Sequence, residues 1–236
     1  MSDPRGSDKV EERTQQSSAD PNSTVRRYVL SPMRSSDVPE VSQLERRCFS
    51  NPWPESAYYR ELREPERNYY VVLRWETARS EEEPELVGAT GTLARLLRAA
   101  RPARTSAYPL VGFAGMWIIY GEAHVTTIGV APEHRGLGLG EVLFLTLISE
   151  AIRRGAEFVT LEVRVSNVTA QSLYAKYGFT RRGVRPRYYS DNLEDAYIMT
   201  SPPLRDPTYR QELVALRDRL LERLAAEGIE IVEEAA

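Results

Sequence analysis

Three glycines alternate with leucines in the segment HRGLGLG, which runs from His134 to Gly140. Glycine costs backbone entropy, so this density predicts a special backbone shape or a close ligand, whereas a plain tight turn needs only one glycine. The dinucleotide-binding pattern G-x-G-x-x-G fails because Leu143 occupies its last position, and the P-loop pattern fails because no lysine follows. A glycine loop before a helix still offers bare N–H groups and a positive helix end, which bind anions. The spacing Arg135-x-x-Gly138-x-Gly140 therefore predicts a loop that straddles a pyrophosphate.

The elements around this loop are typical of an α/β or α+β domain. The strand EAHVTTIGV precedes the loop, and the helix EVLFLTLISEAIRR after it is apolar nearly all round, which predicts burial. The strand EFVTLEVRV then alternates with period two, so that Val159, Leu161 and Val163 share a core face while Glu162 lies on the polar face. A capped helix, SNVTAQSLYAKYG, and two strands around a Tyr- and Arg-rich loop follow. This order favours a single domain with strands and helices interspersed.

Composition excludes several classes of protein. The 236 residues suit one domain with extensions, 42% of them are hydrophobic, and the net charge of -3 gives no sign of a nucleic-acid partner. A single cysteine excludes an intramolecular disulfide framework, and with two histidines it does not suit a structural zinc site, so we expect no metal. No apolar run is long enough to span a membrane, and the N-terminus lacks the apolar core of a secretory signal. We therefore expect a cytoplasmic protein without a membrane partner.

The chain is expected to contain one domain with a tail, an insertion and an extension. Residues 1–26 are polar, and we expect them to form a disordered tail. The domain is expected at 27–203, with an arginine-rich insertion at about 78–108 that is either a solvated loop or a site for an anionic partner. Residues 204–236 are expected to form a helical extension that packs on the same chain or on a second copy in a homodimer. The leucines on one face of this helix are Leu213, Leu216, Leu220 and Leu224.

The glycine loop and its flanks resemble a known family. The motif Arg-x-x-Gly-x-Gly after TIGVAPEHR resembles the acetyl-CoA signature of the GNAT acetyltransferases. Four further segments, FSNPWPESAY, LEVRVSN, LYAKYGF and RRGVRPRYYSDNLEDAYIM, resemble the RimI-like branch, the N-terminal alanine acetyltransferases of a small-subunit ribosomal protein. The resemblance runs from about Tyr28 to Thr200, and the insertion and C-terminal helix have no counterpart in the compact members of this branch. It implies the GNAT fold, a mixed central β-sheet flanked by helices, with acetyl-CoA bound at a splayed strand and the glycine loop.

The resemblance assigns roles to residues near the loop. It implies that Glu162 is the general base, acting through a water, that Tyr174 is the general acid toward the CoA sulfur, and that Asn167 contacts the pantetheine arm. The residues themselves leave alternatives, since Glu162 could be a surface carboxylate paired with Arg164, and Tyr174 a half-buried packing aromatic. The other expected cofactor contacts are the backbones of Ile128 and Val130, with the Val130 N–H as an oxyanion donor, and the pyrophosphate loop of Arg135, Gly136, Leu137, Gly138, Leu139 and Gly140.

The candidate residues for binding a peptide substrate come mainly from two loops. In the resembling branch, loops corresponding to NPWPES and RPRYYS flank a peptide groove, so Trp53, Tyr188 and Tyr189 are candidates for gripping a protein N-terminus, with packing as an equal alternative. Glu122 precedes the central strand and could face the groove. The two histidines, His124 and His134, are expected to be polar surface residues.

The resulting prediction is an acetyl-CoA-dependent N-terminal protein acetyltransferase acting on an N-terminal alanine of a ribosomal protein. An α-amino group has a pKa of about 7.7–8.0, so it loses its proton near neutral pH far more readily than a lysine, with a pKa near about 10.4. Cys48 lies far from the motif in sequence, which favours direct transfer in a ternary complex over a covalent enzyme intermediate. A lysine or small-molecule amine acetyltransferase is the alternative within the fold. A CoA-binding module without turnover is the alternative outside catalysis.

Overall fold

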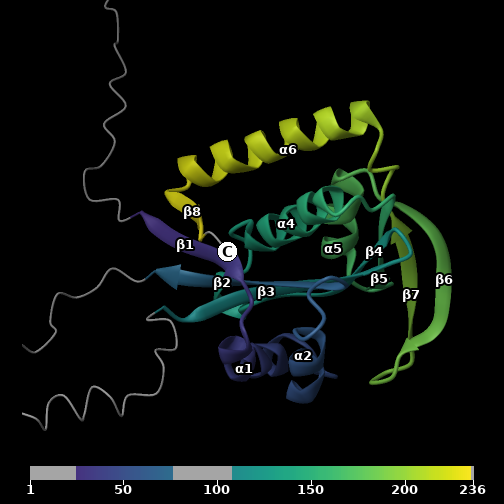
Figure 1. Cartoon of the computed structure of the whole chain (residues 1–236), viewed down its shortest axis with the longest axis horizontal. Helices are drawn as coiled ribbons and strands as arrows, with labels where there is room; N and C mark the ends of the chain where they lie inside the picture. Colours follow the sequence, from purple (N-terminus) through teal and green to yellow (C-terminus); the bar gives the residue numbers. More distant parts are fainter. Residues whose placement is uncertain (1–24, 77–107, 235–236) are drawn as a thin grey trace, which may run out of the picture.

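The computed structural model describes residues 25–76 and 108–234, and within them eight strands form one mixed sheet with helices on both faces (Figure 1). The strands are β1 (Arg26–Pro32), β2 (Asn68–Glu76), β3 (Leu110–Ile119), β4 (Glu122–Val130), β5 (Phe158–Arg164), β6 (Thr180–Tyr189), β7 (Glu194–Thr200) and β8 (Ile229–Glu233). Across the sheet they are ordered β6-β7-β5-β4-β3-β2-β1-β8. The prediction of a mixed central sheet flanked by helices is confirmed.

The antiparallel alternation of strands is interrupted in the middle of the sheet, between β4 and β5. β1 to β4 form an antiparallel meander, whereas β5 joins β4 in parallel. Parallel neighbours need a crossover, and the long helix α4 (Leu139–Arg153) supplies it. β7 then pairs antiparallel with both β5 and β6. The short 3-10 turns η1 (Ser35–Asp37) and η2 (Pro132–His134) precede α1 and α4.

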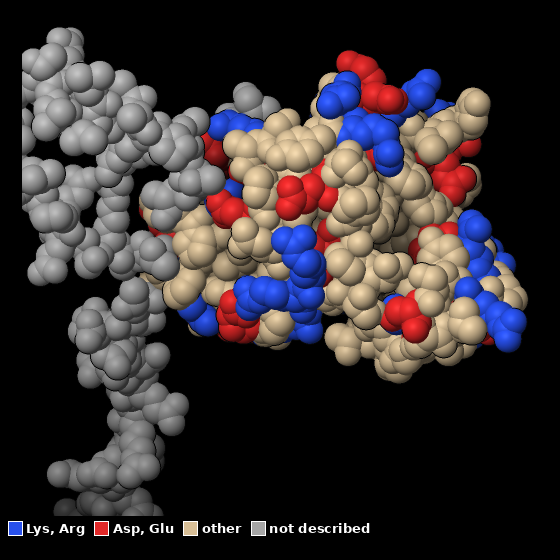
Figure 2. Space-filling view, turned by 90° about the horizontal axis from the view of Figure 1, so that it is seen from below, with Lys and Arg blue, Asp and Glu red and all other residues tan. Residues whose placement is uncertain are grey.

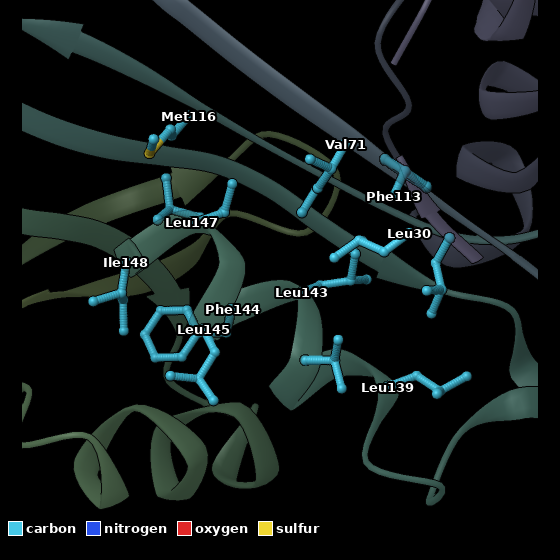
Figure 3. Close-up of a cluster of buried hydrophobic side chains, with 14 of the residues drawn as sticks. Leu30, Val71, Phe113, Met116, Leu139, Leu143, Phe144, Leu145, Leu147 and Ile148 are labelled. Atoms are coloured by element: carbon cyan, nitrogen blue, oxygen red, sulfur yellow. The ribbon is translucent and has the colours of Figure 1, made fainter. Parts of the chain in front are cut away.

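The helices form a layer on each face of the sheet. Helices α1 (Val38–Cys48) and α2 (Glu55–Glu61) cover one face, and α4, α5 (Val168–Lys176) and α6 (Pro207–Ala226) cover the other (Figure 1). Figure 3 shows side chains of α4 meeting those of β2 and β3, with Leu143 and Leu147 near Val71 and Met116. The sequence predicted that α4 is buried on nearly all sides. This is confirmed, because α6 runs above it on the side away from the sheet.

The C-terminal extension belongs to the same fold. The leucine face of α6 joins the hydrophobic cluster that contains α4, so it packs on its own chain. The predicted helix is present, but after Gly228 the chain adds a strand that was not predicted, β8, which pairs parallel to β1. A homodimer through α6 stays a prediction, and it would have to use the exposed side, where Val214 and Leu221 lie.

Two predicted segments lie almost wholly outside the described residues. These are the tail, 1–26, apart from its last two residues, and the insertion, 78–108, apart from its last residue. The predicted loop around RPRYYS differs from the structure, because β6 continues through it to Tyr189 and the turn before β7 comprises residues 190–193. The two candidate tyrosines, Tyr188 and Tyr189, are therefore held by a strand.

Candidate active site

The centre of the sheet opens between β4 and β5. The two strands pair over four residue positions, ending at Val125 and Leu161. Beyond that point β4 stays bonded to β3 as far as Val130, and β5 stays bonded to β7 as far as Arg164. The second halves of both strands therefore border a gap in the sheet. Ile128 and Val130, which were expected to contact a pantetheine arm, lie on the β4 side of this gap.

The glycine loop lies where β4 leads into α4. Gly136 and Gly138 have φ values of 78° and 80°, in the left-handed region that favours glycine, and Gly138 is the N-cap of α4. In the described part of the chain, the N–H groups of residues 136–140 donate to no protein acceptor. Unpaired N–H groups at the positive end of a helix form an anion site. The loop thus has the donors that a pyrophosphate requires.

Three side chains brace this loop. The Arg135 guanidinium donates from Nε to the Val130 carbonyl at 3.1 Å. His134 is buried, and its Nδ1 lies 3.0 Å from the hydroxyl of Tyr28, so the expectation of a surface residue is wrong. Desolvation by burial lowers the pKa of His134, which favours the neutral ring. Cys48 lies 3.4 Å from the Val130 carbonyl despite its distance in sequence. Burial raises the pKa of the Cys48 thiol, which keeps it protonated and a poor nucleophile.

Glu162 lies beside the gap on β5, with its side chain only 6% exposed and a partner on each oxygen. Oε2 lies 2.9 Å from Nε2 of His124 on β4, and Oε1 lies 2.8 Å from Nε of Arg185 on β6. Burial by itself raises the pKa of Glu162, but the hydrogen bonds and charges of His124 and Arg185 outweigh it and hold the pKa below its ordinary value. The alternative of a surface carboxylate paired with Arg164 is wrong, because Arg164 pairs with Asp191 instead. His124 was expected at the surface, yet it joins Glu162.

Tyr174 lies on α5 among aromatic rings. Its ring centroid is 4.9 Å from that of Phe144 and 6.3 Å from that of Phe179. Burial raises the pKa of Tyr174, so its hydroxyl holds its proton and is available as a donor. Asn167 is the N-cap of α5, and its Oδ1 accepts from the Ala170 N–H at 3.1 Å, so its carbonyl oxygen fixes the start of the helix. The cofactor roles of Tyr174 and Asn167 stay predictions.

A row of aromatic rings leads from the α1–α2 loop to the carboxylate. The ring of Trp53 lies 5.9 Å from that of Trp117, which in turn stacks on His124 at 6.0 Å and 23°. On the opposite side, burial and the charge of Glu162 raise the pKa of Tyr188. The ring of Tyr189 lies 5.2 Å from that of Tyr188. Rings from three separate segments, the α1–α2 loop, β3 and β6, therefore gather near Glu162 and its partner His124.

The two predicted substrate loops meet. Asn51 of the α1–α2 loop donates to the Ser190 hydroxyl of the β6–β7 turn at 3.0 Å, and Ser50 donates to Asp191 in the same turn. Figure 2 is viewed from the side covered by α1 and α2. It shows a hollow between these helices and the end of the molecule formed by β6 and β7. Basic side chains gather along the outer edge at this end (Figure 2), where β6 carries Arg181, Arg182, Arg185 and Arg187.

Not every predicted residue joins the cluster. Glu122 is the exposed first residue of β4 and, among the described residues, makes no ion pair or side-chain hydrogen bond. Within residues 25–76 and 108–234, no three His, Cys, Asp or Glu side chains are arranged to hold a metal ion. None of the helices described is long and apolar enough to cross a membrane.

Sequence reasoning missed three residues around Glu162. A histidine two positions after Glu122, in the strand before the glycine loop, was the available signal for His124. Nothing in the sequence near Trp117 indicates a role in the site, because it lies in β3, a strand of mostly apolar residues that is typical of a core. Arg185 is one of four arginines in β6, and the sequence does not tell which of them reaches inward.

Comparison with known proteins identifies the family and near relatives. The family model described as "Acetyltransferase (GNAT) family" matches residues 38–179. A Bacillus subtilis protein, provisionally named a ribosomal protein bS18-alanine N-acetyltransferase, is 35% identical over 71% of this chain and 90% of its own length. A Mycobacterium tuberculosis protein named N-alpha-acetyltransferase RimI is 35% identical over 69% of this chain and 85% of its own length.

A solved structure supports the same relationship. The crystal structure of the ribosomal-protein-S18-alanine N-acetyltransferase from Escherichia coli superimposes with a TM-score of 0.56 at 27% identity. The match covers 75% of this chain and 94% of that protein.

Proposed function

The chain belongs to the acetyltransferase (GNAT) family, and on this premise we propose that it acetylates the α-amino group of a ribosomal protein that begins with alanine. The observation that carries the proposal is the buried Glu162–His124 pair beside the gap that leads from the glycine loop. The near relatives act, by their names, on ribosomal protein N-terminal alanine, and they are matched over most of their length.

The residues present suit acetyl-CoA. The unpaired N–H groups of residues 136–140 would hold its pyrophosphate, and the free half of β4, with Ile128 and Val130, would align its pantetheine arm. When bound, acetyl-CoA supplies an activated acetyl thioester. Asn167, at the start of α5, borders the same gap from the β5 side. An acetyl-CoA site at the gap thus accounts for both the loop and the splayed strands.

The proton of the attacking amine would pass to the Glu162–His124 pair. Glu162 is ionised at neutral pH because its pKa is held low, and a carboxylate with two donors is a weak base on its own. Nε2 of His124 lies 2.9 Å from Oε2 of Glu162 and fixes the position of that carboxylate at the gap. Glu162, acting through a water as the family resemblance implies, then needs His124 as its partner.

Tyr174 would complete the transfer as general acid. Its hydroxyl stays protonated because burial raises its pKa, so it can donate a proton to the departing thiolate sulfur. The Val130 N–H is proposed as the donor to the carbonyl oxygen. Trp53, Tyr188 and Tyr189 would hold the peptide, and the exposed Glu122 would contact it further out.

A lysine or small-amine substrate is the competing proposal, because the gap and the loop suit any acetyl acceptor. The favoured substrate is the α-amino group, since its pKa of about 7.7–8.0 lets a weak base complete the transfer at neutral pH. The cellular setting follows from the substrate. A ribosomal protein substrate fits the expectation of a cytoplasmic enzyme, and no nucleic-acid or membrane partner is proposed. The domain at 27–203, extended by 204–236, would act as one unit.

The deciding experiment compares two matched peptides with acetyl-CoA as donor. One has a free N-terminal alanine and blocked lysines, and the other has a blocked N-terminus and free lysines. We expect transfer to the first peptide and little to the second. Preference for the lysine peptide would replace the substrate class, and CoA binding without transfer to either would favour a small amine or a non-catalytic module.

A further inference from the structure

The end of α6 meets the glycine loop. α6 runs antiparallel to α4, so that its C-terminal end lies above the start of α4 (Figure 1). Leu220 and Leu224 are buried and fix this end of the helix. A Cβ added to Gly138 would lie 2.7 Å from Nη2 of Arg223 and 3.2 Å from Leu224. The Arg223 guanidinium therefore packs directly on the loop that offers its N–H groups to an anion.

Arg223 also offsets the negative charge of a carboxylate beside this loop. Glu141, in the first turn of α4, is buried and would repel an anion held at the helix start. Its Oε2 lies 3.4 Å from Nη2 of Arg223, and its Oε1 accepts from the Tyr177 hydroxyl at 2.7 Å and from Lys176. Lys176 and Arg223 thus both face Glu141 and offset its negative charge at the start of the helix.

We propose that Arg223, supplied by the C-terminal extension, is a cofactor-binding residue that contacts a phosphate group of acetyl-CoA at the glycine loop. This inference rests on the proposed function, since it needs CoA as the ligand. The side chain of Arg223 is 41% exposed, so its guanidinium is accessible to a ligand as well as bonded to Glu141. A guanidinium presents a planar fork of donors that matches phosphate oxygens. Glu227, the C-cap residue of α6, lies 3.2 Å from Nη1 and holds the side chain over the loop.

Through Arg223 the C-terminal extension would take part in cofactor binding as well as in packing. A glycine loop alone offers neutral N–H donors, and Arg223 adds a full charge beside them. The two sources of phosphate in CoA are the pyrophosphate and the 3′-phosphate of the ribose. Both present the same chemistry to a guanidinium, and CoA and 3′-dephospho-CoA distinguish them.

The test measures CoA binding by calorimetry to the full chain and to three variants. Arg223→Gln keeps most of the aliphatic stem and removes the charge, and Arg223→Lys keeps the charge without the fork. Arg217→Ala, six residues earlier on α6 at an arginine paired with its exposed neighbour Asp218, is the control. We expect Arg223→Gln to weaken the binding of CoA about tenfold, which is about 1.4 kcal/mol. The CoA affinity of Arg223→Lys should lie between that of Arg223→Gln and that of the unmodified chain. Arg217→Ala should leave CoA binding unchanged.

A second measurement distinguishes a contact between Arg223 and phosphate from an effect of Arg223 on the shape of the glycine loop. The rate of transfer from S-acetylpantetheine, which has no phosphates, should be the same for Arg223→Gln and the full chain. Loss of the tenfold effect with 3′-dephospho-CoA would assign the contact to the 3′-phosphate, and its persistence would assign it to the pyrophosphate. Unchanged CoA affinity, or an equal loss with S-acetylpantetheine, would overturn the inference. Failure of the proposed function looks different, since the full chain would then bind CoA normally and acetylate neither peptide.

Discussion

His124 Nε2 and Glu162 Oε2 lie 2.9 Å apart, on neighbouring parallel strands at the point where those strands begin to separate. His124 itself pairs in register with Thr160, two residues before Glu162, so the contact runs diagonally toward the gap. Trp117 stacks on the other side of the imidazole and limits its rotation. The geometry joins an imidazole to a buried carboxylate at the mouth of the proposed cofactor site.

Removing either partner of this pair should slow the chemical step. We expect Glu162→Gln and His124→Gln each to lower kcat about 10²- to 10⁴-fold, the usual contribution of general acid–base catalysis, with acetyl-CoA affinity nearly unchanged. Steady-state kinetics with the alanine peptide and calorimetry with CoA would measure both. Glu157→Gln, an exposed glutamate before β5, serves as the control. A loss of CoA affinity with an unchanged rate would show that Glu162 is not the base.

Tyr174→Phe should lower kcat about 10²-fold or more, since the variant loses the proposed proton donor while keeping the ring that packs on Phe144. Thermal unfolding should change little for the same reason. Tyr120→Phe, on a fully exposed residue of the β3–β4 turn, is the control. Equal rates for Tyr174→Phe and the unmodified chain would leave Tyr174 as a packing aromatic only.

The pH dependence should follow the substrate amine. Because the pKa of Glu162 is lowered, this carboxylate stays ionised at and above its ordinary titration range, and it is lost only as the pH falls below that range. With the carboxylate ionised throughout, kcat/KM should rise with pH as the α-amino group loses its proton, with a midpoint at a pH of about 8. A peptide that begins with 3-fluoroalanine has a less basic amine and should shift the rise to lower pH. A midpoint that stays fixed would assign the rise to a group of the enzyme.

The two left-handed glycines of the loop should respond differently to alanine. Both Gly136→Ala and Gly138→Ala strain the backbone by about 1–2 kcal/mol, because their φ values are positive. A Cβ at Gly136 meets nothing within 4 Å, whereas one at Gly138 meets Arg223 and Leu224. We expect Gly138→Ala to weaken CoA binding and lower Tm further than Gly136→Ala. Equal effects would mean that α6 yields to the new methyl group.

Because α6 packs on its own chain, substitutions at the neighbouring residues Leu220 and Leu221 should have different effects on stability. Leu220 is 2% exposed and Leu221 is 46% exposed. Leu220→Ala should reduce the free energy of unfolding by about 2–5 kcal/mol through loss of burial and a residual cavity, and Leu221→Ala by about 0.5 kcal/mol or less. Urea unfolding of both variants measures this. A large effect at Leu221 would instead indicate that the exposed side is covered by a second copy.

Local patterns in the sequence predicted the parts of the site that depend on one segment. The alternation of β5 put Glu162 opposite the core face, and the spacing of the glycines defined the anion loop. The partners of Glu162 could not be predicted, because His124 and Arg185 reach it from other strands and depend on sheet order and register. β8 was missed because IEIVE is too short for its alternation to stand out, and its pairing with β1 links positions far apart in the chain.

The pairing of β1 with β8 has a consequence for biosynthesis. Arg26 is paired with Ile229, 203 positions later, and the Arg26 N–H donates to the Gly228 carbonyl at 2.8 Å. At translation rates of about 5–20 residues per second, β1 waits about 10–40 s after leaving the ribosome before its outer neighbour exists. During that interval the outer edge of β1, paired with β2 on its other side, is open to other polypeptides, and chaperones that shield strand edges would be needed most at this stage. The glycine loop acquires its contact with Arg223 only in the same final seconds, so this contact and the eighth strand of the sheet form together.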